Sequence, residues 1–206
     1  MFASIIFFLI ILFGLILNEF VSRKFLIPAH FSRKMAHIFS ALIVFAMPFF
    51  LSKNEIIIIA VIFAIILFLT RRKNIFSSIH SVERKTFGEI FLPMGVALCA
   101  FCFLPQKTTA FQFGILIMGI SDALASIFGE KFGKHIIKLF GHKKSIEGSA
   151  VFFISSTIIA LFFTSGFNYC IFSVAIILTF TELVSVIGLD NLILPVLGAY
   201  MIQFIK

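Results

Sequence analysis

The sequence has few charged residues and no tryptophan. Only 13% of its 206 residues are Asp, Glu, Lys or Arg, whereas 61% are hydrophobic and the mean hydropathy is +1.16. A soluble domain of this length could not bury that much apolar surface, but a lipid bilayer can solvate it. The composition therefore excludes a soluble globular domain and predicts a polytopic membrane protein. The 31 phenylalanines suit a lipid environment but do not identify a lipid.

Cysteine is scarce as well, and linkers and repeats are absent. Cys99 and Cys102 have CxxC spacing, but they and Cys170 lie in apolar runs without the polar surroundings of a zinc or redox site, which favours packing roles. No basic residue precedes the first apolar run and no small-residue cleavage site follows it, so we expect a retained helix and not a signal peptide. Without linkers or repeats, the expectation is a single domain, 1–206.

Apolar runs long enough to cross, or nearly cross, a bilayer predict the helices. They cover 2–19, 36–52, 55–70, 89–105, 109–128, 148–165, 168–187 and 191–205. The last run is short, so seven or eight spans are both open. The fold expected is an all-α polytopic membrane protein with about 7–8 transmembrane helices in one bundle.

The basic residues indicate the orientation of these spans. Most of them follow the first, third and fifth runs, for example Arg23, Arg71 and Lys131. Because cytoplasmic loops are rich in Lys and Arg, these loops are predicted to be cytoplasmic and the N-terminus external. Every acidic residue except Glu55 also lies in or beside these ends. We therefore expect a multi-pass integral membrane protein with its active site on the cytoplasmic face.

One acidic residue lies inside an apolar run. Asp122, in ILIMGISDALASIF, would lie roughly 10 Å below the end of its helix. A carboxylate at that depth costs about 2–3 kcal/mol and usually faces a partner or a water-filled cavity. Asp122 is therefore an interhelical ion-pair partner, a metal ligand or a base for an alcohol.

Small residues follow Asp122 at intervals of four, ending at Gly129 and Gly133. The spacing fits close helix packing, and it equally fits a backbone that phosphate oxygens can approach. The spacing between the two glycines and the His after Lys134 do not match a Walker A loop, which disfavours a P-loop NTPase.

A second polar stretch, KKSIEGS, leads directly into the sixth run. Ser145 is the predicted N-cap of that helix, whose free N–H groups and dipole would attract phosphate. Lys143 and Lys144 lie beside this helix end, and Glu147 could hold an accompanying Mg²⁺. The alternative is a basic membrane anchor, which would explain the two lysines but not the neighbouring residues.

These motifs, taken in order, resemble the CTP-dependent lipid kinases, a family that includes phytol kinase, dolichol kinase and fungal CTP-using diacylglycerol kinase and is distantly related to phosphatidate cytidylyltransferases. The resemblance runs from about Arg33 to Pro195, which leaves the first helix (1–20) peripheral to a core of about 30–206. The matching pieces are Asp122-xx-Ala-Ser-xx-Gly129-xxx-Gly133, Lys143-Lys144-Ser145-x-Glu147-Gly148-Ser149, Arg33-Lys34-xx-His37, Thr86-Phe87-Gly88-Glu89 with Pro93, and Glu182 followed by Gly188-Leu189-Asp190-Asn191 and Pro195.

The resemblance implies that CTP donates its γ-phosphoryl group to a lipid alcohol, with Mg²⁺ as cofactor. Catalytic roles are expected for Asp122, Lys144 and Glu147. Nucleotide or phosphate binding is expected for Arg33, Lys34, His37, Gly129, Gly133, Lys143, Ser145 and Gly148. The expected Mg²⁺ ligands are Asp122, Glu147, Glu182 and Asp190, and Glu89 and Asn191 are further motif residues. His37 could instead orient the alcohol or bond a backbone carbonyl.

Several functions stay open at this point. The favoured acceptor is a prenol or polyprenol-type alcohol such as phytol, and diacylglycerol is the alternative. A cytidylyltransferase that forms a CDP-lipid is disfavoured because a Pro-Gly-His-Gly-Gly ending is lacking, and a small transporter or anion channel is disfavoured because no internal symmetry is visible. The expected partners are CTP, the lipid alcohol and the bilayer, with a homo-oligomer open and no nucleic acid.

Overall fold

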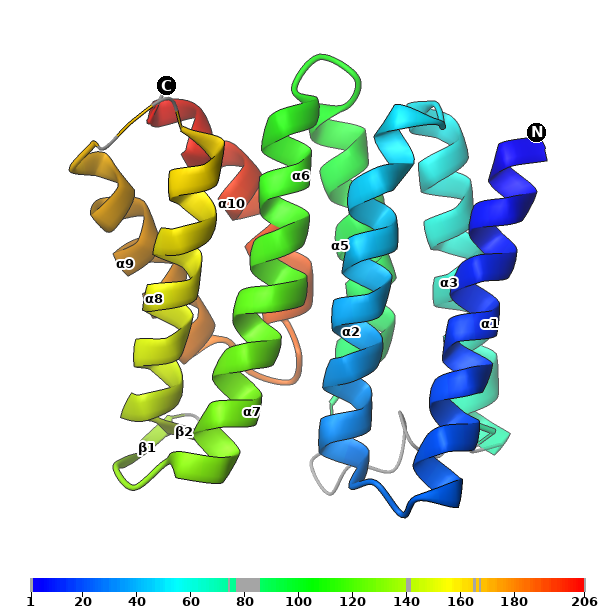
Figure 1. Ribbon diagram of the computed structural model, residues 1–206, viewed down its shortest axis with the longest axis horizontal. Helices are drawn as coiled ribbons and strands as arrows, with labels where there is room; N and C mark the ends of the chain where they lie inside the picture. The colour runs from blue at the N-terminus through cyan, green and yellow to red at the C-terminus, as the bar shows by residue number, and fades with distance from the viewer. Residues whose placement is uncertain are drawn as a thin grey trace.

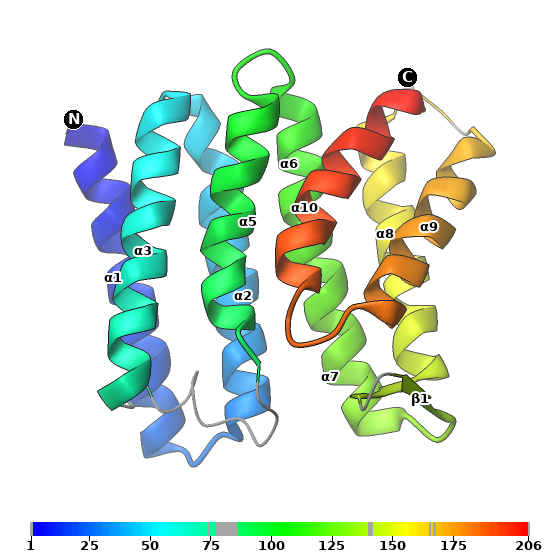
Figure 2. The ribbon, with the colours of Figure 1, turned by 180° about the vertical axis from the view of Figure 1, so that it is seen from behind.

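The described residues form a bundle of eight helical rods (Figures 1 and 2). The computed structural model describes residues 2–73, 75–76, 86–139, 142–164, 166 and 168–205. The rods are α1 (Phe2–Lys24), α2 (Ala29–Ala46), α3 (Lys53–Lys73), α5 (Gly88–Phe103), α6 (Thr108–Leu116) continuing through a π-helical segment η2 (Ile117–Ser121) into α7 (Asp122–Phe132), α8 (Ile146–Phe163), α9 (Cys170–Val184) and α10 (Asp190–Met201). Short 3₁₀ turns, η1 (Met47–Phe49) and η3 (Ile202–Phe204), follow α2 and α10. Each rod corresponds to one apolar run, so the predicted all-α membrane fold is confirmed.

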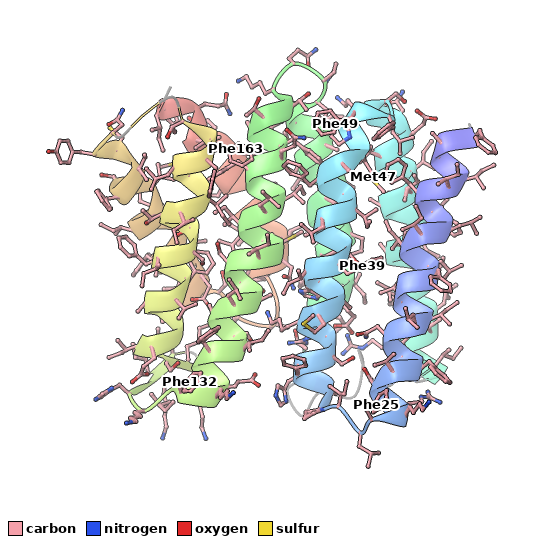
Figure 3. The ribbon with its side chains drawn as sticks, in the orientation of Figure 1. Phe25, Phe39, Met47, Phe49, Phe132 and Phe163 are labelled. Atoms are coloured by element: carbon pink, nitrogen blue, oxygen red, sulfur yellow. The ribbon has the colours of Figure 1, made fainter. Side chains whose placement is uncertain are left out.

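Four of the described rods are long and apolar enough to cross a membrane: α1, α3, the α6–α7 rod and α8. The helices α5 and α9 are apolar but shorter. The exposed surface is rich in Phe, Ile and Leu, as expected for helices that face lipid. Figure 3 shows such side chains at both ends of the bundle, with Phe49 at the end of α2 and Phe132 at the end of α7.

The two ends of the bundle differ in the segments they carry. Both termini lie at one end, and the α1–α2 turn and the segment after α7 lie at the other (Figure 1). The second end carries two of the three predicted basic loops, with Arg23, Lys24 and Lys131 among them. The remaining basic loop follows α3, and most of it, including Arg84 and Lys85, falls outside the described residues.

A two-stranded antiparallel hairpin interrupts the helical pattern between α7 and α8. Its strands are β1 (Ile136–Leu139) and β2 (His142–Ser145), with Ile136 opposite Ser145 and Lys138 opposite Lys143. No apolar run covers this segment, so the sequence predicts no transmembrane helix there. The hairpin carries Lys143 and Lys144 directly to the start of α8.

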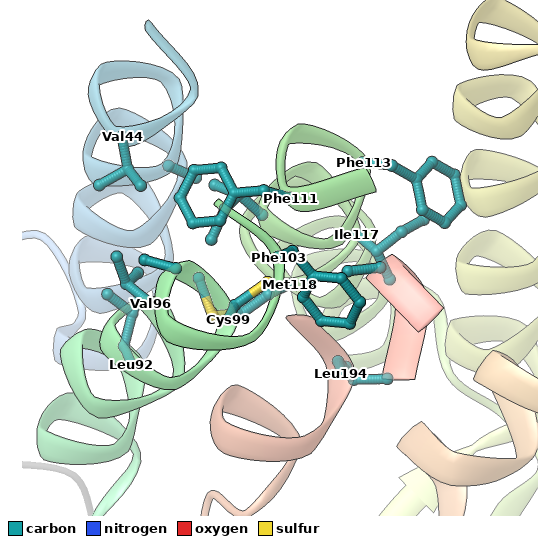
Figure 4. Close-up of a cluster of buried hydrophobic side chains, with 14 of the residues drawn as sticks. Val44, Leu92, Val96, Cys99, Phe103, Phe111, Phe113, Ile117, Met118 and Leu194 are labelled. Carbon is teal, nitrogen blue, oxygen red and sulfur yellow. The ribbon is translucent and has the colours of Figure 1, made fainter. Parts of the chain in front are cut away.

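The core is built around α5, α6 and α10. Figure 4 shows its buried side chains, with Phe103, Phe111, Met118 and Leu194 among those drawn. Glycines let these helices approach closely, since a Cβ added at Gly114 would lie 2.0 Å from the carbonyl oxygen of Pro195. Of the cysteines, Cys99 is buried and its thiol lies 3.3 Å from the same carbonyl, whereas Cys102 and Cys170 are exposed and none forms a disulfide.

The junction between α9 and α10, residues 185–189, lies within the bundle (Figure 2). Both helices are short, so the chain turns back before it reaches the end that carries the hairpin. Ile187 and Gly188 have positive φ angles of 60° and 89°, and the Ile187 carbonyl accepts a hydrogen bond of 3.0 Å from the Phe87 amide. A β-branched residue in this region is an outlier. Non-helical backbone at membrane depth is tolerated where it is buried in protein or lines a water-filled cavity.

Candidate functional site

A polar cavity of about 590 Å³ lies between α2, α7, the start of α8 and the α9–α10 junction. This volume is within the usual range for a ligand site, roughly 300–1,000 Å³. Most of the residues singled out in the sequence line it: Arg33, Lys34, Asp122, Gly129, Gly133, Lys143, Lys144, Ser145, Gly148, Glu182, Asp190 and Asn191. The structure therefore brings together motifs that are far apart in the sequence.

Asp122 is paired with a lysine from another helix. Lys34 Nζ lies 2.5 Å from Asp122 Oδ2, and only 8% and 3% of the two side chains are exposed. The π-helical segment η2 ends immediately before Asp122. Such segments locally widen a helix and are frequent at functional sites. Asp122 is thus an interhelical ion-pair partner, and because this pair lies in the cavity wall, its position also suits a metal ligand or a base for an alcohol.

Lys144 connects β2 to both α9 and α10. Its Nζ lies 2.6 Å from Glu182 Oε1, donates to the Glu182 carbonyl, and lies 3.9 Å from Asp190 Oδ2. The Glu182 and Asp190 side chains are 8% and 16% exposed. Two acidic groups therefore share one partly buried lysine, whose charge offsets the cost of removing their carboxylates from water.

Arg33 supplies hydrogen-bond donors that the described part of the chain does not use. Its Nε and Nη1 atoms are buried and have no hydrogen-bond partner among the described residues. Arg33 lines the same cavity as Lys34 and Lys144. A planar guanidinium with open donors matches the geometry of a phosphate group.

The small residues bring α7 and α8 together beside this cavity. A Cβ added at Gly148 would lie 2.8 Å from the carbonyl oxygen of Ala125, and one added at Gly129 would lie 2.8 Å from Ser145 Oγ. The Ser145 hydroxyl accepts a hydrogen bond of 3.1 Å from the Gly148 amide, so the predicted N-cap of α8 is confirmed. Close packing and exposure of backbone to the cavity occur at the same glycines.

Three residues from the predicted set lie elsewhere. Glu147 does not line the cavity: its Oε1 is 2.7 Å from His135 Nδ1 on the hairpin side of α8. His37 and Glu89 line a separate apolar cavity, and Glu89 Oε1 lies 2.5 Å from Arg71 Nη1. Asn191 does line the polar cavity and also links α10 to α5, since its amide donates to the Gly88 carbonyl at 3.0 Å.

Six further polar residues of the cavity wall received no site role from the sequence, although three of them stand in the quoted motifs: His30, Thr86, Ser126, Glu130, Ser149 and Ser185. Ser126 lies one turn after Asp122 on α7, so its helical spacing was a usable signal. His30 pairs with Glu130, with 3.0 Å between Nε2 and Oε2, at an exposed position. Ser185 begins the α9–α10 junction, whose position in the bundle no local pattern reveals.

The carboxylates of the cavity suit a Mg²⁺ ion that arrives with phosphates. Among the described residues, no three His, Cys, Asp or Glu side chains are grouped closely enough to form a metal site from protein ligands alone. Mg²⁺ usually needs only one or two carboxylates, because substrate phosphates and water complete its octahedral shell. Asp122, Glu182 and Asp190, which all line the cavity, fit that requirement.

Comparison with known proteins assigns the family. Phytol kinase of Synechocystis is 32% identical over 195 residues, which cover 90% of this chain and 83% of that protein. The chain belongs to the phytol kinase family. An uncharacterized protein of Methanocaldococcus jannaschii is 39% identical over 118 residues, 56% of this chain and 58% of its own length. Dolichol kinase sec59 of Schizosaccharomyces pombe is 38% identical over 66 residues, 32% of this chain and 12% of that kinase.

The chain matches no protein-family profile. It also matches no solved structure. Membership of the phytol kinase family confirms the resemblance to lipid kinases that the motifs indicated, and with the apolar rods it identifies an integral membrane protein.

Proposed function

We propose that this member of the phytol kinase family is a lipid-alcohol kinase that transfers the γ-phosphoryl group of CTP to a prenol or polyprenol-type alcohol, with Mg²⁺, at the cytoplasmic face. The observation that carries the proposal is the polar cavity, where buried cations and carboxylates from four parts of the chain meet. The relatives named phytol kinase and dolichol kinase support an alcohol acceptor. CTP as donor is supported by the motif resemblance.

The cavity offers what phosphoryl transfer requires, which is positioning and charge stabilisation more than covalent chemistry. Arg33 and Lys34 on α2, and Lys143 and Lys144 on β2, surround the cavity with positive charge. The backbone at Gly129 also lies in the cavity wall, because glycine has no side chain to cover it. These groups would hold the β- and γ-phosphates and stabilise the charge that develops between them.

In the transfer, the alcohol oxygen forms a bond to the γ-phosphorus, and the bond from that phosphorus to the β–γ bridging oxygen breaks. The electron pair leaves with CDP, and the hydroxyl proton leaves to a base or to water. Asp122 is the carboxylate nearest to Lys34 and would hold the metal or accept this proton. Lys144 would keep Glu182 and Asp190 ionised and in place.

Mg²⁺, when bound together with the nucleotide, would supply positive charge that neutralises part of the phosphate charge. Asp122, Glu182 and Asp190 are the residues that would hold it. Glu147 is left out of this set, because it contacts His135 and does not line the cavity.

The test supplies purified protein with Mg²⁺ and either γ-labelled CTP or γ-labelled ATP, together with phytol, farnesol, undecaprenol, dolichol and diacylglycerol. We expect label in a prenol-type monophosphate, with CDP as the second product and with CTP preferred over ATP. Transfer of label to diacylglycerol alone would reject a prenol-type alcohol as the acceptor. A preference for ATP would reject CTP as the donor. Release of pyrophosphate with formation of a CDP-lipid would reject the kinase and identify a cytidylyltransferase.

A further inference from the structure

A second cavity, smaller and apolar, lies between α1, α2, α3 and α5. Its volume is about 60 Å³, several times the roughly 10–15 Å³ that one water molecule needs. Its walls are aliphatic and aromatic except for His37, Ser40 and Glu89. Figure 4 shows part of this wall, where Val44 from α2 faces Leu92 and Val96 from α5. A cavity with mostly apolar walls can accept hydrocarbon.

His37 is the unusual residue of this wall. It is 5% exposed, and neither ring nitrogen has a hydrogen-bond partner among the described residues. A buried polar group without a partner is unfavourable, and in native proteins it usually has a ligand, a water or a role in function. The imidazole can both donate and accept, as a hydroxyl can. His37 therefore indicates a polar ligand atom at one edge of an apolar cavity.

The apolar cavity and the polar cavity share α2. Lys34 faces the polar cavity and pairs with Asp122, and His37 follows one turn later and faces the apolar cavity. Gly119, which precedes Asp122 by less than one turn, packs against the same part of α2: a Cβ there would lie 3.5 Å from the His37 carbonyl oxygen. A group held at His37 is thus next to the proposed phosphate site.

We propose that the apolar cavity binds the hydrocarbon segment next to the hydroxyl of the acceptor alcohol and that His37 hydrogen-bonds this hydroxyl. This inference rests on the proposed function, because it names the acceptor subsite of the same reaction. A nucleobase is a poor occupant, since the aliphatic walls offer few hydrogen-bonding groups. The cavity holds only a short segment, so the rest of the chain extends into the bilayer along α1, which supplies Ile11 and Leu15 to the wall.

The first test is photolabelling with a phytol-length alcohol that carries a diazirine near its hydroxyl. We expect label on the wall of the apolar cavity, for example on Leu15 or Phe63, mapped by mass spectrometry. The substitution Ala60→Leu narrows the cavity and should lower this labelling about fivefold or more. The control Ala64→Leu, one turn further along α3 and outside the wall, should not change it. Label confined to other helices, or label unaffected by Ala60→Leu, would overturn the proposal.

The second test measures both substrates in His37→Phe, which removes the hydrogen bond and keeps a ring. We expect the KM of the alcohol to rise about tenfold, the KM of the nucleotide to stay within about twofold, and His37→Gln to recover most of the loss. A rise in the nucleotide KM instead would assign His37 to the phosphates and reject this role.

Photolabelling requires neither nucleotide nor turnover. If no alcohol is phosphorylated while the cavity wall is labelled, the kinase proposal fails and the lipid subsite stands. If alcohols are phosphorylated while the wall is not labelled, the subsite fails and the kinase proposal stands.

Discussion

The two cavities of this protein are built in different ways. The apolar cavity lies among regular helices, α1, α2, α3 and α5, and its wall has few polar groups. The polar cavity lies where the chain is irregular, at the π-helical segment before Asp122, the β1–β2 hairpin and the α9–α10 junction. Irregular backbone near a membrane needs polar partners or water, so these places also admit charged side chains. If the proposed function holds, the regular helices bind the lipid and the irregular segments bind the phosphates.

Among the substitutions in the polar cavity, removal of the Asp122 carboxylate should lower activity the most. In Asp122→Asn the Lys34 ammonium stays buried opposite a neutral amide, so we expect kcat/KM to fall about 10³-fold and stability to fall by about 3–5 kcal/mol. Activity is measured with labelled CTP and stability by thermal unfolding in detergent. Photolabelling of the apolar cavity should persist below the unfolding temperature.

A double variant separates the two effects of this substitution. Lys34→Met with Asp122→Leu removes both charges, and well-packed apolar replacements of a buried pair are often neutral for stability. We expect the stability to return and the activity to stay lost. If the double variant kept activity within about tenfold of the parent, the pair would be structural and the assignment of Asp122 would fail.

Lys144 and Lys138 offer a matched comparison within one hairpin. Lys144 lines the polar cavity and holds Glu182 and Asp190, whereas Lys138 on β1 is exposed and lies outside the cavity wall. We expect Lys144→Met to raise the KM of the nucleotide about 10²-fold, and Lys138→Met to change it less than about twofold, since an exposed charge contributes little. Equal effects in steady-state kinetics would show that net positive charge, and not the cavity, binds the nucleotide.

The sequence predicts the regular part of the molecule well. Long apolar runs match all eight rods, because burial in lipid demands the same composition at every turn. Asp122 and Ser145 could also be found, since an acid inside an apolar run and a Ser at a helix start have local causes. The pairing of Asp122 with Lys34 needed the fold, because it joins positions 88 apart.

The irregular part could be predicted only in outline. The hairpin has four-residue strands and no strong turn signal among its described residues, so the direction of Lys144 toward Glu182 was not visible. The sequence also does not reveal toward which side of α8 the Glu147 side chain points. The first turn of α8 presents Gly148 and Ser149 to the cavity and leaves Glu147 beside His135. A motif can fix which residues are close along the chain without fixing which face they share.

Glu147 and Glu182 give the sharpest comparison of motif with geometry. The same substitution, Glu→Gln, removes one charge at each position. Glu182 lines the cavity and contacts Lys144, so Glu182→Gln should lower kcat/KM about 10²-fold and raise the Mg²⁺ concentration needed for half-maximal rate. Glu147 hydrogen-bonds His135 and does not line the cavity, so Glu147→Gln should change both quantities less than about threefold.

The opposite result would also be informative, because the motif predicts a metal ligand at Glu147. If Glu147→Gln shifted the Mg²⁺ requirement as strongly as Glu182→Gln, the carboxylate of Glu147 would have to turn into the cavity when nucleotide binds. The hydrogen bond between His135 and Glu147 would then break in the bound state. His135→Ala should in that case lower the Mg²⁺ requirement, whereas a purely structural contact predicts no change. The pair of variants therefore decides whether Glu147 belongs to the site when nucleotide is bound or stays outside it, as in this structure.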